Sequence, residues 1–250
     1  MKTKKFVRVL CVCDPKGPDY WLNSTIDTDG EMLDCYVNGQ GSLLDNRDLN
    51  VHRWMVVKVA RGDITTRHHR SCFSRGKILF SGPRVEATSA KWFPSGLVVG
   101  ATRRAGAFGT AATGDGGGSV AGTSGTAISG AFGVSKAGYG GVAVSGHRGS
   151  SFAGGYGKAF AGNAGMATCG AEGMAVSGVN GLSVAAGEHA VASTGNGGVV
   201  SGMKGGVLLV KYYSNNCLRV AVGYVGEDGI EPNIEYKVNS VGGFVPAEGA

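Results

Sequence analysis

The sequence predicts an all-β protein: a thin, two-sided β-solenoid of octad repeats with a small N-terminal all-β domain and a C-terminal β cap. Three observations lead to this prediction. Glycine accounts for 46 of 250 residues, far above the usual share of about 7%, and it recurs at fixed spacing between residues 102 and 205. Residues between the glycines alternate as they do in a strand. No stretch has the pattern of an amphipathic helix.

Residues 1–101 have the pattern of a small all-β domain. Alternating apolar residues begin at Phe6, and Asn38-Gly39 indicates a hairpin turn. Further strand-like runs are RWMVVKVARGDITTR and RGKILFSG.

Residues 102–205 divide into thirteen octads numbered from Thr102, in a frame that we expect to hold without insertion or deletion. Column eight is Gly in twelve rows, with His189 the exception, and column five is Gly in eleven, with Ala186 and Thr194 the exceptions. Such fixed-period similarity is typical of repeat architectures. Columns one to four predict a short strand. The glycines of columns five and eight are predicted to supply the positive φ angles of a tight turn.

Two octads then make one flat coil, so that alternate octads stack on the same side and pair in parallel. Columns two and four carry small residues and are predicted to face the interior, while column three faces outward. On one side, column three is apolar throughout: Ala112, Ile128, Val144, Phe160, Val176 and Ala192. On the other side it is mixed: Arg104, Val120, Lys136, Phe152, Thr168, Val184 and Val200. An exposed apolar stripe normally marks a contact surface, so we expect binding through Ile128, Val144, Phe160 and Val176.

A bundle of polyproline-II helices is the rival fold for the repeats. That fold places glycine at every third position, whereas the spacings here alternate between three and five. The two-sided solenoid is therefore favoured over the bundle and over a disordered segment.

Residues 206–250 predict three strands, Val207–Tyr213, Leu218–Val225 and Glu235–Val238, with turns at Ser214-Asn215-Asn216 and at 226–229. The last coil of a solenoid presents unpaired backbone groups and needs a cap. We expect this segment to be that cap.

The repeats followed by GGVLLVKYY and LRVAVGYVGEDGIEPNIEYKV resemble uncharacterised proteins encoded in bacteriophage and prophage genomes. In that group, short repeats of the A-x-S-G type lead into a similar closing module. The resemblance covers the repeats and the C-terminal segment and implies a phage origin. It brings no catalytic residues with it.

The formal net charge is +6, with an excess of positive charge in residues 1–101 that permits an acidic or phosphate-bearing partner. Neither a signal peptide nor a membrane span is evident, so the expected location is the host cytoplasm, with no membrane partner. The six cysteines form no CxxC motif and favour free buried thiols. A zinc site is the weaker alternative, from residues spread over the N-terminal domain: Cys11, Cys13, Cys35, Cys72 and the pair His68-His69.

Motifs of catalysis are missing, including GxSxG, HExxH and the P-loop pattern. We therefore expect neither enzymatic activity nor a cofactor. The densest polar cluster is Arg67, His68, His69 and Arg70; it is a candidate for binding phosphate or an acidic surface, against the simpler interpretation of a solvated loop. Six cations in residues 102–205 are few for a nucleic-acid binder, so nucleic acid is not the expected partner.

Two functional hypotheses follow. The first is a non-enzymatic phage protein whose rigid solenoid engages, and inhibits, a host protein such as a defence component; self-association through the apolar side is a related prediction. The second is a virion component, such as a tail-fibre tip or adhesin, whose columns six and seven contact a cell-surface glycan.

Overall fold

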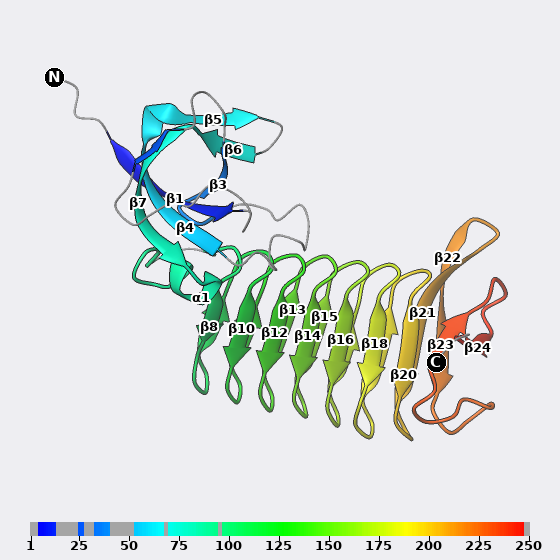
Figure 1. Cartoon of the computed structure of the whole chain (residues 1–250). Coiled ribbons are helices and arrows are strands. Elements are labelled where there is room, and N and C mark those ends of the chain that lie inside the picture. Colours follow the sequence, from blue (N-terminus) through cyan, green and yellow to red (C-terminus); the bar gives the residue numbers. More distant parts are fainter. Residues whose placement is uncertain are drawn as a thin grey trace. The chain divides into compact units, whose positions relative to one another are not determined.

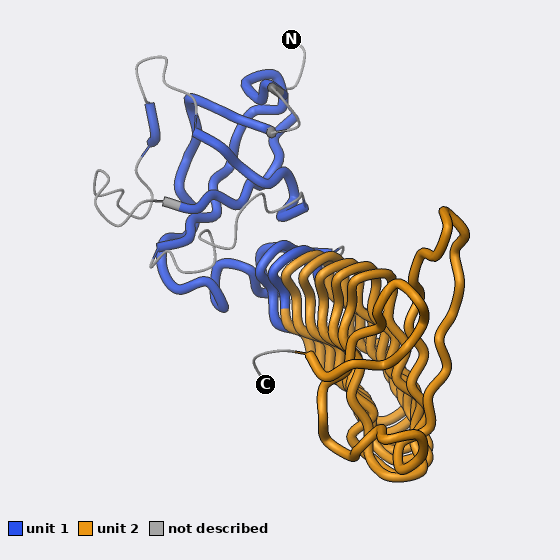
Figure 2. The backbone as a smooth tube through the Cα atoms, turned by 90° about the vertical axis from the view of Figure 1, so that its right-hand side faces the viewer, with its two compact units in different colours: residues 1–102, 113–117 blue, residues 103–112, 118–250 orange. Residues whose placement is uncertain are grey.

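In a computed structural model of the chain, the described residues are 5–13, 25–27, 33–40, 53–67, 70–94 and 97–247, with only the backbone described for Cys13, Arg67 and Arg70. The chain divides into two compact units, one of residues 1–102 with 113–117 and one of residues 103–112 with 118–250 (Figure 2). Almost all regular structure is β; the described helices are the four-residue α1 (Arg84–Ala87) and the 3-10 helix η2 (Arg61–Asp63). Among the described residues, no helix is long and apolar enough to cross a membrane.

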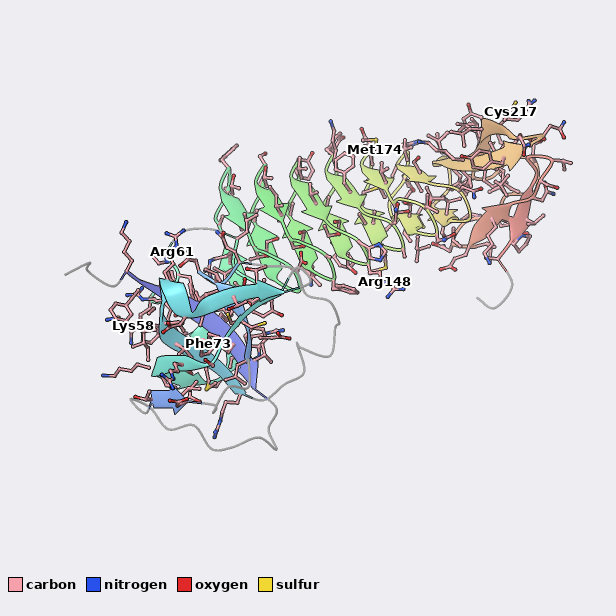
Figure 3. The ribbon with its side chains drawn as sticks, turned by 90° about the horizontal axis from the view of Figure 1, so that it is seen from above. Lys58, Arg61, Phe73, Arg148, Met174 and Cys217 are labelled. Carbon is pink, nitrogen blue, oxygen red and sulfur yellow. The ribbon has the colours of Figure 1, made fainter. Side chains whose placement is uncertain are left out.

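The first unit contains a seven-stranded antiparallel sheet with the order β2-β7-β4-β1-β3-β6-β5. Its strands are β1 (Phe6–Cys13), β2 (Thr25–Asp27), β3 (Leu33–Val37), β4 (Arg53–Ala60), β5 (Ile64–Arg67), β6 (Arg70–Phe73) and β7 (Arg75–Gly82). Large side chains fill both of its faces. Phe73 and Ile78 belong to one core cluster, and Trp54 and Phe93 belong to the other. Figure 3 labels Phe73 within this sheet.

Among the described residues, Asn38-Gly39 does not join β3 to a second strand of a hairpin. Both residues do make a tight turn, since their φ angles are 53° and 71° and Gln40 donates a backbone hydrogen bond to Val37. In the sheet, however, β3 lies between β1 and β6. The turn therefore leads out of β3 without pairing it with β4, the next strand among the described residues.

The second unit is a two-sided β-solenoid, as predicted (Figure 1). The fourteen strands from β8 to β21 alternate between two sheets, two per coil, and make seven coils. Each strand from β8 to β19 pairs in parallel with the strand two further along, so that Gly118 lies beside Val134 and Thr126 beside Val142. The repeat strands are β8 (Thr102–Arg104), β9 (Thr110–Ala112), β10 (Gly118–Ala121), β11 (Thr126–Ile128), β12 (Val134–Ala137), β13 (Val142–Ser145), β14 (Ser150–Ala153), β15 (Lys158–Ala161), β16 (Met166–Cys169), β17 (Met174–Val176), β18 (Leu182–Ala185), β19 (Val191–Thr194) and β20 (Val199–Gly202).

Small residues fill the space between the two sheets. Column two is fully buried at Ala143 and at Ser151, and column four is nearly so at Ser145. The hydroxyls bond across the interior: Ser151 Oγ lies 2.8 Å from Ser145 Oγ and donates to the carbonyl oxygen of Phe160 at 2.6 Å. Because Ser151 has one hydroxyl hydrogen, Ser145 is the donor of the bond between the two serines.

The octad frame contains an insertion, so the prediction of an unbroken frame is wrong. Met174 pairs with Val191, and Leu182 pairs with Val199, which are steps of seventeen residues where the other coils have sixteen. The extra residue lies in the turn between Ala185 and Val191.

Apart from Gly197 and Gly205, the glycines of columns five and eight do not supply the positive φ angles, so this prediction is wrong for the other turns. The positive φ occurs two residues before the next strand begins, which is column seven up to the insertion and column eight of the unbroken frame after it. This position is Gly in only four turns: Gly116, Gly140, Gly197 and Gly205. The other nine are Phe108, Ser124, Phe132, Arg148, Tyr156, Ala164, Glu172, Asn180 and His189.

Glycine is required in columns five and eight because successive coils approach closely there. A Cβ atom at Gly146, in column five, would lie 2.7 Å from the backbone nitrogen of Ala131 in the coil before. At Gly165, in column eight, it would lie 2.8 Å from the carbonyl oxygen of Gly149. Both distances are too short for any side chain.

The C-terminal segment continues both sheets. It forms β21 (Val207–Ser214), β22 (Cys217–Tyr224), β23 (Tyr236–Val238) and a strand that the sequence does not predict, β24 (Phe244–Pro246). The eight-stranded sheet ends at β22 and the nine-stranded sheet at β24. Ile230, Tyr236 and Phe244 pack against the end of the solenoid core, at Leu208 and Val210. The segment thus caps the interior, while the hairpin of β21 and β22 projects beyond the coils (Figure 1).

Candidate functional site

The outward column-three residues of one sheet form the predicted stripe. Ile128 pairs with Val144, Val144 with Phe160, and Phe160 with Val176, each directly beside the next on parallel strands. Neighbouring strands lie about 4.8 Å apart, so these four side chains make a continuous row. Ile128 is 36% exposed, and the other three are half-buried by their neighbours along the row.

Column one lies on the same side and widens the row into a surface. We call this surface the apolar face and define it by columns one and three of β11 to β19: Thr126, Ile128, Val142, Val144, Lys158, Phe160, Met174, Val176, Val191 and Ser193. Its single charged group is Lys158. Figure 3 labels Met174 on this outer side.

The insertion changes which residue ends the stripe. Ala192, which the unbroken frame assigns to column three, is fully buried and pairs with Leu208, whereas Ser193 takes the outward position beside Val176. Beyond Ser193 the face continues through Leu209 of β21 to Val222 of β22, which is 52% exposed.

The opposite side of the solenoid carries a second outward face with more polar groups, which we call the mixed face. Its column three runs through Val120, Lys136, Phe152, Thr168 and Val184 in register. Lys136 Nζ lies 5.6 Å from the centre of the Phe152 ring. The unbroken frame places Val200 in this row, but Val200 is fully buried, so that part of the prediction is wrong. Column one here is also largely apolar, so the two faces differ less than column three alone indicates: Val134, Met166, Leu182 and Val199.

The turns on one side of the coils bear exposed aromatic rings, which we call the aromatic rim. Phe108, Tyr139 and Tyr156 are 82%, 58% and 51% exposed. The rings of Tyr139 and Tyr156 lie 5.2 Å apart, and the Tyr156 hydroxyl donates to Glu172 Oε1 at 2.6 Å. This hydrogen bond raises the pKa of Tyr156 above its ordinary value. The rim offers ring faces beside a hydrogen-bonding carboxylate.

The basic cluster lies at a β-hairpin. Arg67 ends β5 and pairs with Arg70, the first residue of β6. His68 and His69, which connect them, lie outside the described residues. The structure thus places the two arginine backbones at one hairpin end, and the binding role of the cluster stays a prediction.

Four of the described cysteines, Cys11, Cys35, Cys72 and Cys169, are buried thiols. Burial, with the neighbouring Cys72 second, raises the pKa of Cys35 to about 12, and burial raises the pKa of Cys169 to about 11. The described side chains include no group of three His, Cys, Asp or Glu residues that could hold a metal ion. The alternative zinc set also involves the Cys13 side chain and the two histidines, which lie outside the described residues.

Comparison with known proteins adds no relative. No protein-family model, no curated protein and no solved structure matches the chain. The fold and its surfaces define the class of protein: a β-solenoid with a small-residue interior and broad, largely apolar outer faces.

Proposed function

We propose that the chain is a non-enzymatic, phage-encoded binding protein that engages a host protein through the apolar face. The observation that carries the proposal is the unbroken register of Ile128, Val144, Phe160 and Val176 on adjacent strands. Large apolar side chains in such a row favour a contact surface over a purely solvated one.

The dimensions of the apolar face support a protein partner. Five strands about 4.8 Å apart, each with about four residues rising about 3.3 Å, give a surface of roughly 20 by 13 Å. A helix of about 13 residues has a similar length and width, and the face of another sheet fits equally well. Because the backbone is fixed by pairing on both sides, little ordering entropy opposes docking.

The phage origin rests on the sequence resemblance, and the host cytoplasm as location and a defence component as target are parts of the proposal that accompany such an origin. Inhibition is the simplest effect of a rigid protein that covers a functional surface of its target. These parts of the proposal depend on identifying the partner.

The test compares two matched triple variants. V144D/F160D/V176D places charges on the apolar face, and V120D/F152D/V184D places them in the same column of the mixed face. We expect a tagged full chain to capture a host protein from cell extract, and the purified partner to bind the chain directly. The apolar-face variant should lose this binding while it keeps the β-rich circular dichroism of the parent. The mixed-face variant should retain it. Equal binding by both variants would contradict the proposal.

The aromatic rim favours a second candidate, a virion component that contacts a cell-surface glycan. Exposed tyrosine rings stack on sugar rings, and Glu172 would accept hydrogen bonds from sugar hydroxyls. Detection of the protein in purified particles, with glycan binding lost in Y139A/Y156A, would support this candidate over the first.

A further inference from the structure

The last strand of the eight-stranded sheet, β22, has an open edge. It pairs with β21 on one side, and on the other side no described strand is its neighbour. Its outward side chains are more exposed than those of the coils: Leu218, Val220, Val222 and Tyr224 are 51% to 56% exposed. On inner strands of the same sheet, Val144 and Val176 point to the same outer side but are less exposed, since each is half-buried.

The backbone groups on this edge can be assigned from the hairpin turn. Asn215 and Asn216 both have positive φ, which is the type I′ geometry of a two-residue hairpin closed by Ser214 and Cys217. Counting from that closing pair, hydrogen-bonded and non-hydrogen-bonded residue pairs alternate along the two strands. The backbone N–H and C=O groups of Arg219, Ala221 and Gly223 therefore form hydrogen bonds with β21.

It follows that the N–H and C=O groups of the alternate residues point away from β21: Leu218, Val220, Val222 and Tyr224. Within the described part of the chain, the one backbone hydrogen bond to this set from outside the ladder is from Glu227 N–H to the carbonyl oxygen of Tyr224. Leu218, Val220 and Val222 thus present three donors and three acceptors in a row. An apolar edge of this kind is a template for another strand.

We propose that β22 pairs with β22 of a second copy of this chain, antiparallel about a two-fold axis. A strand edge is self-complementary under such an axis. Centring the pair on Ala221 sets Val220 opposite Val222 of the second copy and Leu218 opposite Tyr224. The four residues whose backbone groups point away from β21 then lie opposite the same four residues of the second copy. The side-chain contacts between the two strands are apolar.

The charges on this edge are compatible with a second copy as its occupant. In the same register, Arg219 lies opposite Gly223 of the second copy, so no like charges meet across the pair. Lys211 lies one strand further in, beside Val220. The arrangement joins the two eight-stranded sheets into one, independently of any host protein bound at the apolar face.

The test is the mass of the full chain in solution, measured by sedimentation at high micromolar concentration. We expect twice the mass of one chain. Val220→Pro removes an N–H that β21 does not use, which an edge strand tolerates, and it should weaken the dimer on the order of 100-fold. Val220→Thr keeps the N–H and the branched side chain and should dimerise as the parent does. Phe160→Asp, on the apolar face, should also leave the mass unchanged.

Amide hydrogen exchange gives a second readout that does not depend on the variant folding well. In the parent at high concentration, the amides of Val220 and Val222 should exchange as slowly as those of Arg219 and Ala221. On dilution, or in V220P for Val222, the edge amides should become fast while the ladder amides stay slow. A parent of single-chain mass with fast edge amides would overturn the proposal. So would a dimer that V220P leaves intact, or edge protection that arises only when another protein is added.

Discussion

The N-terminal sheet and the solenoid are both all-β, yet their interiors are built from opposite kinds of side chain. Trp54, Phe73 and Leu10 are fully buried in the first unit, whereas the solenoid buries Ala, Ser, Thr and Cys through six of its coils. Large apolar side chains stabilise the first through removal of area from water. In the second, little area is available per residue, and the stabilisation comes from parallel backbone pairing and close approach between coils.

The two interiors are therefore sensitive to opposite kinds of substitution. A core of large side chains is destabilised when a side chain is removed, because a cavity is left. A core of small side chains is destabilised when an atom is added or a hydroxyl loses its partner.

The largest expected effect is on the first unit. Phe73→Ala should destabilise it by about 3 to 5 kcal/mol, because a fully buried ring is replaced by a cavity. Urea unfolding followed by Trp54 fluorescence measures this. Phe152→Ala, a half-buried ring on the mixed face, should cost clearly less in the unfolding of the solenoid. Equal effects would remove the contrast between the two cores.

The second effect tests close approach in the solenoid. Gly146→Ala should destabilise it by about 2 kcal/mol or more, because the added Cβ meets the backbone of the preceding coil, which cannot move aside as a side chain can. Thermal unfolding followed by circular dichroism checks the change. Gly106, in the same column of the first coil, has no atom within 4 Å of a Cβ, so Gly106→Ala should be neutral or slightly stabilising. A similar loss at both positions would mean that backbone flexibility, not contact, selects glycine.

The coil architecture could be predicted from sequence because close approach recurs at the same column in each coil. The same contact that excludes a Cβ at Gly146 is repeated at Gly162, where a Cβ would lie 2.7 Å from the backbone of Gly146. A single sequence therefore carries the signal many times. The sheet order of the N-terminal unit has no such repetition, since it depends on pairings between distant strands such as β1 with β4.

The prediction of an unbroken frame failed for a physical reason that the sequence displays. The three exceptions to the glycine columns, Ala186, His189 and Thr194, all lie around the inserted residue, and their clustering is the signal of the insertion. The exposed outer side chains of β22, by contrast, appear in the sequence as one more apolar strand. That the strand lies at an open edge depends on the order of strands in space.

The third effect separates hydrogen bonding from packing in the small-residue core. Ser151→Ala should cost about 2 kcal/mol, because it removes the bond to the Phe160 carbonyl and leaves the buried Ser145 hydroxyl without an acceptor. Ser145→Ala should cost about 1 kcal/mol, since Ser151 keeps its own donor bond. The double variant should cost less than the sum, and a double-mutant cycle on thermal unfolding measures the coupling.

Another coil of the same chain naturally has alanine at both of these positions. The equivalent positions one coil further along are Ala161 and Ala167, so both hydroxyls are absent there together. Strict additivity of the two serine variants would show that the bond between them contributes nothing.

The smallest effect, and the one with opposite sign, concerns the positive φ position of the turns. Ala164 has a φ of 52° and an exposed side chain. An L-residue is strained by about 1 to 2 kcal/mol in this conformation, which exceeds the entropic penalty of about 0.5 to 1 kcal/mol for glycine. Ala164→Gly should therefore stabilise the solenoid by roughly 0.5 to 1 kcal/mol, measured as a rise in Tm. Ala171, the preceding position of the next turn, is exposed without a positive φ, so Ala171→Gly should lower Tm. If both changes lowered Tm, the turns would not hold column seven in the left-handed region.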